Sequence, residues 1–121
     1  MNVETALKEA MAIDGAIGAA LVDYESGMSL GTIGGGTDLD LEVAAAGNTE
    51  VVRAKARTLA ALGLNESVED ILITLSAQYH LIRPTSNSGG SLFLYLALDR
   101  SRGNLALARH SLRNIATGLK I

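Results

Sequence analysis

The sequence predicts an α+β fold with the element order α-ββ-α-βββ-α, in which one five-stranded antiparallel sheet is sandwiched by helices. Three observations support this fold class. An amphipathic segment opens the chain, a long run of helix-forming residues occupies its middle, and short apolar runs separated by Gly, Asn and Ser flank that run. The 121 residues suffice for one hydrophobic core, so residues 1–121 are predicted to form a single domain.

The composition limits the classes of protein that this chain can belong to. Hydrophobic residues make up 48% and charged residues 19%, which excludes a disordered chain because enough apolar surface can be buried to offset the entropy of folding. With one Phe, three Tyr and no Trp, the core has to be built from aliphatic residues and alanine. The scarcity of aromatic residues and the net charge of −3 argue against a nucleic-acid partner.

The expected location follows from cysteine usage and from the hydropathy of the chain. Cysteine is absent, which excludes disulfides and thiolate metal sites and fits a reducing cytoplasm. The first residues carry acids and lack the basic start and continuous apolar stretch of a signal peptide. No apolar run approaches the roughly 20 residues that span a bilayer. We therefore expect a cytoplasmic protein with no integral membrane association.

The first part of the chain predicts a helix followed by a β-hairpin. Apolar residues recur at intervals of three and four over residues 3–11, which predicts an amphipathic helix that ends near Asp14. Two apolar runs then predict hairpin strands, from Ala16 to Asp23 and from Met28 to Ile33. The first strand is rich in Gly and Ala, and side chains this small predict that another element packs closely over it.

The middle of the chain predicts a long helix with three distinct sides. It runs from about Leu39 to Leu62, with N-cap oxygens offered by Thr37 and Asp38. One apolar stripe is expected to dock on the sheet: Leu41, Ala45, Val52, Ala56 and Leu59. A second stripe predicts a homodimer contact, because the predicted elements leave nothing else to cover it: Ala44, Asn48, Val51, Lys55 and Leu62. The remaining side is a polar arc: Glu42, Glu50, Arg53 and Arg57.

The last part of the chain predicts three strands and a helix. The strands are expected at Val68–Ser76, Tyr79–Thr85 and Ser91–Leu98, as an antiparallel meander. Both faces of the third strand are apolar, so it is predicted to be central and covered on both sides. Pro84 cannot donate to a neighbouring strand and is expected at an edge or near a strand end. Asn104 is expected to cap a final helix that reaches Gly118.

The charges near the C-terminus are all basic. Residues 100–121 contain no acid, and the final helix is expected to have a basic face: Arg102, Arg109, Arg113 and Lys120. One explanation is a solvent-exposed face whose positive charges offset the excess of acidic residues in the rest of the chain. The alternative is a contact with an acidic protein surface or an anionic lipid.

The usual signatures of catalysis and cofactor binding are missing, so we expect no enzyme, no cofactor and no metal site. Gly34–Gly36 precedes a helix, but no Gly-Lys-Ser/Thr follows and the acids after it would repel a phosphate. His80 and His110 lack a second ligand at metal-binding spacing. No serine has the spacing of a nucleophile elbow.

Several segments together resemble the roadblock/LC7 domain, the family of dynein light chain roadblock and of bacterial GTPase regulators. They are the run DGAIGAALVD from Asp14 to Asp23, the following Gly27-Met28, the long alanine-rich helix, LFLYL from Leu92 to Leu96, and Asn104-Leu105-Ala106. The resemblance covers essentially the whole chain. It implies the same element order, with the long helix on one face of the sheet and the first and last helices on the other.

The resemblance also implies a function. Members of the family are non-enzymatic homodimers or heterodimers, in which two sheets join at their edges and two long helices lie side by side, and bacterial members accompany small Ras-like GTPases. The polar arc of Glu42, Glu50, Arg53 and Arg57 would then be the candidate partner contact. Two other classes stay open: a small-molecule sensor of the profilin or PAS type, and a purely structural self-assembling dimer.

Overall fold

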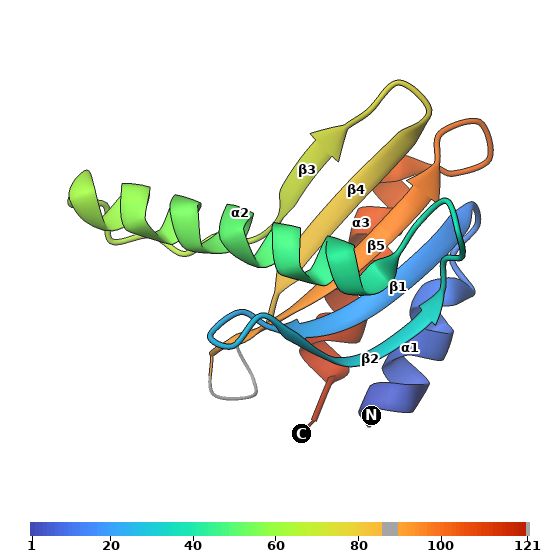
Figure 1. Ribbon diagram of the computed structural model, residues 1–121, viewed down its shortest axis with the longest axis horizontal. Coiled ribbons are helices and arrows are strands. Elements are labelled where there is room, and N and C mark those ends of the chain that lie inside the picture. The colour runs from blue at the N-terminus through green and yellow to red at the C-terminus, as the bar shows by residue number, and fades with distance from the viewer. Residues whose placement is uncertain (86–89, 121) are drawn as a thin grey trace.

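The computed structural model describes residues 1–85 and 90–120, and its elements follow the predicted order α-ββ-α-βββ-α. The helices are α1 (Val3–Met11), α2 (Leu41–Ala61) and α3 (Leu105–Gly118), and the strands are β1 (Ala16–Asp23), β2 (Met28–Gly34), β3 (Ile71–Thr74), β4 (Gln78–Pro84) and β5 (Leu92–Asp99). The predicted fold class, α+β with a five-stranded antiparallel sheet, is therefore confirmed (Figure 1).

The sheet has the strand order β2-β1-β5-β4-β3, with every neighbouring pair antiparallel. The predicted central strand is central: β5 lies in the middle, and Leu92–Leu98 are buried without interruption. The last three strands form the predicted meander. Pro84 is the final residue of β4, where its missing N–H costs little.

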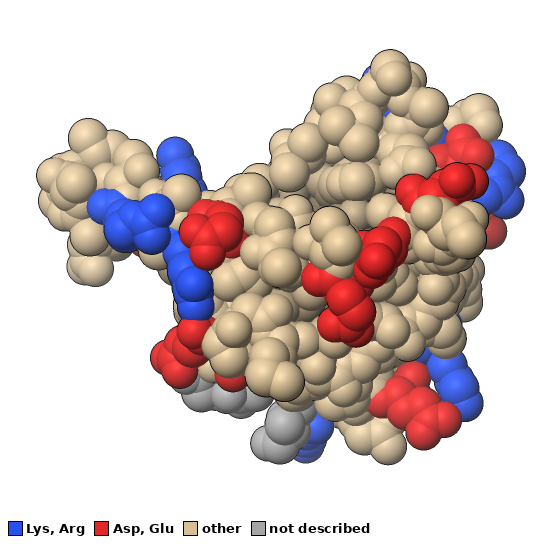
Figure 2. Space-filling view, viewed as in Figure 1, with Lys and Arg blue, Asp and Glu red and all other residues tan. Residues whose placement is uncertain are grey.

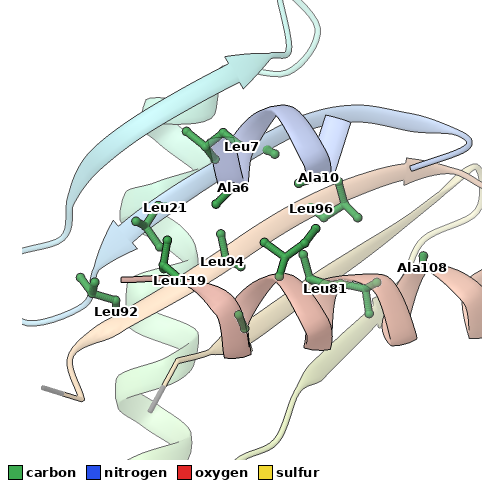
Figure 3. Close-up of a cluster of buried hydrophobic side chains, with 14 of the residues drawn as sticks. Ala6, Leu7, Ala10, Leu21, Leu81, Leu92, Leu94, Leu96, Ala108 and Leu119 are labelled. Carbon is green, nitrogen blue, oxygen red and sulfur yellow. The ribbon is translucent and has the colours of Figure 1, made fainter. Parts of the chain in front are cut away.

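Helices cover both faces of the sheet, so the structure has three layers (Figure 1). One core lies between the sheet and the pair α1 and α3; it includes Leu7, Leu21, Leu96 and Leu112 (Figure 3). The other lies between the sheet and α2 and contains Phe93, Tyr95 and Ile82 beside the inward side chains of that helix. The alternation of side chains along β5 supplies both cores, since Leu94, Leu96 and Leu98 point one way and Phe93 and Tyr95 the other.

The small residues of β1 confirm the prediction of a close neighbour. A Cβ on Gly18 would lie 3.0 Å from the backbone nitrogen of Gly35 and 3.2 Å from Cδ2 of both Leu39 and Leu41. The segment that leads into α2 thus rests directly on this strand. This contact sets the position at which the long helix begins.

The start of α2 differs from the prediction. Asp40, rather than Thr37 or Asp38, is the N-cap, and its carboxylate accepts from the backbone N–H groups of Glu42 and Val43 at 3.0 and 3.2 Å. A short bridge between Gly36 and Leu39 explains the shift, because it folds residues 36–39 into a turn that no helix can share.

The first strand of the meander is shorter than predicted, since β3 covers only Ile71–Thr74 of the expected Val68–Ser76. It lies at the edge of the sheet and is hydrogen-bonded to β4. Residues 62–70 return from the end of α2 to this strand and are mostly exposed (Figure 1). A strand can extend only where a partner lies beside it, and β4 pairs with the four residues from Ile71 to Thr74.

Candidate interaction surface on the long helix

The second half of α2 extends beyond the sheet (Figure 1). Its buried residues end at Val52, and from Ala54 onward the helix is exposed apart from the half-buried Leu59. The predicted docking stripe is therefore correct for Leu41, Ala45 and Val52 but wrong for Ala56, which is exposed. A projection of the helix shows only which side chains share a side. Whether the sheet is long enough to cover that side depends on the tertiary structure.

An apolar stripe runs along the whole outer length of α2. Its members fall within about 100° of one another when the helix advances by about 100° per residue, and they are exposed or half-buried: Val43, Ala44, Gly47, Val51, Ala54, Thr58 and Leu62. Val43 is 67% exposed and Leu62 is 64% exposed. The hydroxyl of Thr58 donates to the carbonyl oxygen of Ala54 at 2.9 Å, so the stripe is almost free of polar groups that need a partner. We call this surface the α2 stripe.

The α2 stripe overlaps only partly with the predicted dimer contact. Ala44, Val51 and Leu62 belong to it, and Lys55 lies at its margin, exposed to solvent. Sequence reasoning missed Val43, Gly47, Ala54 and Thr58, although their spacing of four and seven residues was the signal that could have identified them.

Asn48, which the sequence predicts at the dimer contact, does not lie on the α2 stripe in the single chain. It is only 9% exposed and forms a hydrogen bond with Tyr95 of β5. The burial of Leu41, Ala45 and Val52 fixes the rotation of the helix about its axis, and with this rotation Asn48 points toward the sheet.

An open groove of about 880 Å³ separates the overhanging half of α2 from the segment that returns to β3. Residues 51–59 of α2 form one wall and residues 66–71 the other. The lining is apolar at Val51, Leu59 and Ile71 and carries charge at Lys55 and Glu69. The α2 stripe and this groove therefore form one continuous surface.

Arg109 lines the groove and connects α3 to the residue that precedes β3. Its Nε donates to Oδ2 of Asp70 at 2.8 Å, and its Nη2 donates to Oδ1 at 2.9 Å. Such a two-point contact fixes the orientation of both groups. Arg109 is thus engaged within the chain, as is Arg102, which pairs with Asp99 at 3.4 Å. Of the predicted basic face of α3, Arg113 and Lys120 lie exposed without an ion pair among the described residues.

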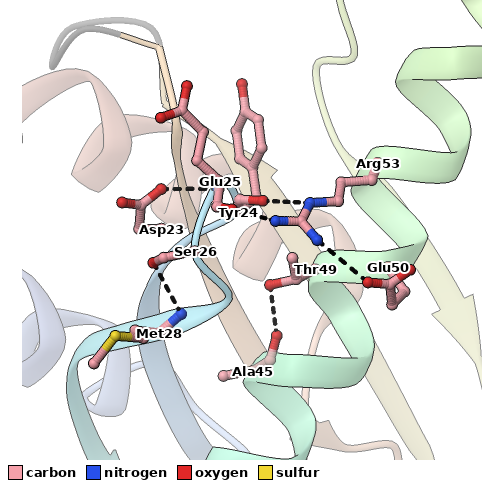
Figure 4. A network of polar contacts seen from close by, with 9 residues as sticks. All are labelled: Asp23, Tyr24, Glu25, Ser26, Met28, Ala45, Thr49, Glu50 and Arg53. Atoms are coloured by element: carbon pink, nitrogen blue, oxygen red, sulfur yellow. Dashed lines mark hydrogen bonds and ion pairs between the residues drawn. The ribbon is translucent and has the colours of Figure 1, made fainter.

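The members of the polar arc of α2 have different roles, and Figure 4 shows Glu50 and Arg53. Glu42 accepts a hydrogen bond from the hydroxyl of Ser29 on β2 at 2.9 Å. Arg53 donates to the backbone carbonyl of Tyr24 at 2.7 Å and to that of Glu25, and its Nη1 lies 3.4 Å from Glu50. These two arc residues thus hold the β1–β2 hairpin against the helix.

Arg57 lies one turn further along, exposed on the overhang. Acidic side chains gather over the start of α2 and basic side chains over its overhanging end (Figure 2). The polar arc therefore carries both negative and positive charges, and the positive charge of Arg57 faces solvent.

Both histidines form hydrogen bonds with neighbouring side chains of the chain. His80 on β4 contacts Gln78 and Tyr95, whereas His110 lies on the exposed side of α3 beside Asn114. Among residues 1–85 and 90–120, no three His, Cys, Asp or Glu side chains gather in a group that could hold a metal ion. In the same residues, no helix combines the length and the apolar character needed to cross a membrane.

Comparisons with known proteins show which fold this is. No protein-family profile matches the sequence, and no curated protein matches it. Among solved structures, a roadblock/LC7 domain from Streptomyces avermitilis superposes with a TM-score of 0.80 at 11% identity, covering 96% of this chain and 92% of the other.

Structures of MglB are also similar. MglB from Myxococcus xanthus has a TM-score of 0.73 at 19% identity, with 93% of this chain and 83% of the other covered. An MglB described as having a tetrameric arrangement has a TM-score of 0.69 at 18% identity, with coverage of 93% and 86%. The chain therefore has the roadblock/LC7 fold.

Proposed function

We propose that two copies of this chain associate through the α2 stripe, and that the homodimer is a non-enzymatic adaptor or regulator that binds a small Ras-like GTPase. The α2 stripe is the observation that carries this proposal. This apolar surface runs along the outer side of α2, both where the helix lies on the sheet and where it extends beyond it. An exposed apolar surface of this length marks a site of protein association. The roadblock/LC7 fold supports a partner of the kind that the family resemblance implies.

A second copy fits the α2 stripe for geometric reasons. Around a two-fold axis the same patch meets itself, so a self-complementary surface needs no other partner. Gly47 and Ala54 have almost no side chain, which would let two helices approach closely. The MglB with a tetrameric arrangement supports self-association as a property that this fold accommodates.

The edge strand β3 supports the same assembly. It lies at the rim of the sheet, and Leu72 and Leu75 beside that rim are 38% and 41% exposed. Exposed edges of this kind attract further strands, and natural proteins usually cover them. A second copy that lies along the α2 stripe and the adjoining groove would bring its own β3 close to this edge.

The proposed contact for the GTPase is the polar arc, which lies beside the α2 stripe rather than on it. Mixed charges at the rim of an interface set the orientation and the rate of association. Because Arg53 is bonded to the hairpin, Arg57 and Glu50 are the arc residues whose charged groups can best reach a partner.

Light scattering of the purified chain tests the homodimer. We expect twice the mass of one chain for the natural sequence and the mass of one chain for Ala54→Glu, because two carboxylates would be buried without partners at the axis. Ala46→Glu is the matched control, since Ala46 is exposed on the same helix but lies outside the α2 stripe. A natural chain that is monomeric at tens of micromolar rules out the proposed assembly.

Binding of a Ras-like GTPase is tested separately. The probe is the small Ras-like GTPase encoded nearest to the gene of this chain, loaded either with GDP or with a non-hydrolysable GTP analogue. We expect calorimetry to show binding that the charge reversal Arg57→Glu weakens about tenfold, a loss of roughly 1.4 kcal/mol, with the melting temperature unchanged. A dimer that binds this GTPase equally well after the reversal would place the contact elsewhere.

A further inference from the structure

A relay of hydrogen bonds connects the sheet to α2 beneath the long helix. Oε1 of Gln78 lies 2.8 Å from Nε2 of His80, and Nδ1 of His80 lies 3.2 Å from the hydroxyl of Tyr95. That hydroxyl also forms a hydrogen bond with the side chain of Asn48 on α2. The two rings meet edge to face, with centroids 5.4 Å apart and planes at 88°. The proposed partner contacts do not use any of these four side chains.

The relay lies in the interior. Tyr95 is 1% exposed, Asn48 is 9% exposed and His80 is half-buried. Burial raises the pKa of Tyr95 to about 12, against a smaller lowering by the hydrogen bond from Asn48, so the hydroxyl keeps its hydrogen at any physiological pH. Burial also lowers the pKa of His80, which keeps the imidazole neutral near pH 7.

The direction of each hydrogen bond follows from the neutral imidazole. Oε1 of Gln78 can only accept, so the hydrogen of the ring is on Nε2, and Nδ1 must accept from the Tyr95 hydroxyl. The phenol oxygen then accepts from the amide nitrogen of Asn48. In this state His80 uses both ring nitrogens, and the hydrogen bonds of the relay all point from α2 toward β4.

We propose that this relay is a pH-sensitive latch that holds α2 on the sheet while His80 is neutral and loosens it when His80 takes up a proton. A proton from solvent on Nδ1 turns that atom into a donor, so the Tyr95 hydroxyl has to accept from it and to direct its own hydrogen toward α2. Asn48 then has to rotate its amide to offer oxygen in place of nitrogen. The rotated amide must find a new acceptor for its hydrogens within a buried contact.

Few other charges reach the face of the sheet on which His80 lies. Asp99 on β5 shares this face, but hydrogen bonds from Ser101 lower its pKa, so it stays ionised in weak acid. Lys55 of α2 is exposed, and β3 has the uncharged sequence ILIT. Arg83 alternates with His80 along β4 but lines a groove together with Val52 and Leu59 of α2, and an arginine keeps its charge throughout this pH range. Among residues 1–85 and 90–120, His80 is therefore the group on this face whose charge is expected to change between pH 7.5 and pH 5.

The sign of the effect follows from linkage. The unfolded chain binds a proton at His80 near the ordinary pKa of 6.5, and the folded chain binds it only at a lower pH. The stabilising contribution of neutral His80 is complete above about pH 6.5 and is lost as the pH falls from there toward the lowered pKa. Acid should therefore lower the stability of the folded chain as His80 takes up a proton.

Backbone hydrogen exchange of residues 41–52, measured at pH 7.5 and pH 5.5 and corrected for the intrinsic rate, tests the latch. We expect protection of this segment to fall several-fold in acid for the natural chain. In Tyr95→Phe, His80 stays half-buried but is no longer connected to Asn48, so protection should be equal at both values of pH. Equal protection in the natural chain, while NMR shows that His80 titrates in that range, would overturn the proposal, as would an unchanged acid response in Tyr95→Phe.

Thermal unfolding provides a second measurement with a matched control. The melting temperature should fall less between pH 7.5 and pH 5.5 in His80→Gln than in the natural chain. His110 is the other of the two histidines and is exposed on α3, so His110→Gln should behave like the natural chain. The reverse result, in which His110→Gln removes the pH dependence and His80→Gln does not, contradicts the latch. Both measurements use the chain alone and are independent of its partners.

Discussion

Nε of Arg53 donates a hydrogen bond to the backbone carbonyl of Tyr24 at 2.7 Å and so joins the middle of α2 to the β1–β2 hairpin. The same guanidinium also donates to the carbonyl of Glu25. The Tyr24 hydroxyl continues the connection by donating to the carbonyl of Gly90, just before β5. A single arginine thus holds a turn whose backbone carbonyls would otherwise face water or the charged rim of the helix (Figure 4).

Replacing this arginine is expected to loosen the hairpin. Arg53→Ala should lower the free energy of unfolding by about 1–2 kcal/mol, because it removes charge-assisted hydrogen bonds to two carbonyls at a half-exposed site. Urea denaturation measures the loss. Arg57→Ala is the control and should change the stability by less than about 0.5 kcal/mol, as is usual for exposed side chains without fixed contacts. Equal effects of the two replacements would show that the contacts of Arg53 add nothing to stability.

Gly47 is expected to reveal whether a second helix approaches α2. A Cβ at this position would meet no atom of the chain within 4 Å, and glycine inside a helix costs roughly 0.5–1 kcal/mol relative to alanine. Gly47→Ala should therefore stabilise the fold by about this amount under conditions that keep the chain monomeric.

The bulkier variant Gly47→Leu tests the assembly itself. If the α2 stripe packs closely against its copy, leucine should weaken the association while leaving the helical content, measured by circular dichroism, unchanged. Sedimentation over a range of concentrations gives the dissociation constant. If Gly47→Leu leaves this dissociation constant unchanged, the two helices do not approach each other at Gly47.

Gly18 is expected to tolerate no side chain. A Cβ there would lie 3.0 Å from the backbone nitrogen of Gly35 and 3.2 Å from the side chains of Leu39 and Leu41. Gly18→Val adds further carbons to this contact and should cost about 1–3 kcal/mol of stability through overpacking. Thermal unfolding measures the cost, and a variant as stable as the natural chain would show that the segment before α2 moves aside freely.

No tight nucleotide binding is expected from the chain alone. Gly34–Gly36 form a turn with positive φ before α2, and the carboxylates of Asp38, Asp40 and Glu42 follow it. Negative charge at this end of the helix would repel a triphosphate, even though helix N-termini usually attract anions. Calorimetry with GTP and ATP should show no binding in the micromolar range, and a micromolar dissociation constant would contradict this expectation.

The sequence by itself determined the element order, the central position of β5 and the close neighbour over β1. These features follow from local patterns, namely the period of the apolar residues, the two apolar faces of one strand and the small side chains of another. Such patterns depend on residues that are near in the chain, so no tertiary information is needed to read them.

Only the tertiary structure decided where Asn48 points, how far α2 overhangs the sheet and which arginine is free. Asn48, Lys55 and Val51 share one side of a helical projection, yet Asn48 is buried because the rotation of α2 is set by its docking on the sheet. Arg53 and Arg57 look equivalent on the same projection, but the hairpin carbonyls lie within reach of Arg53 alone. Contacts between residues far apart in the chain make these distinctions, and a helical projection contains none of them.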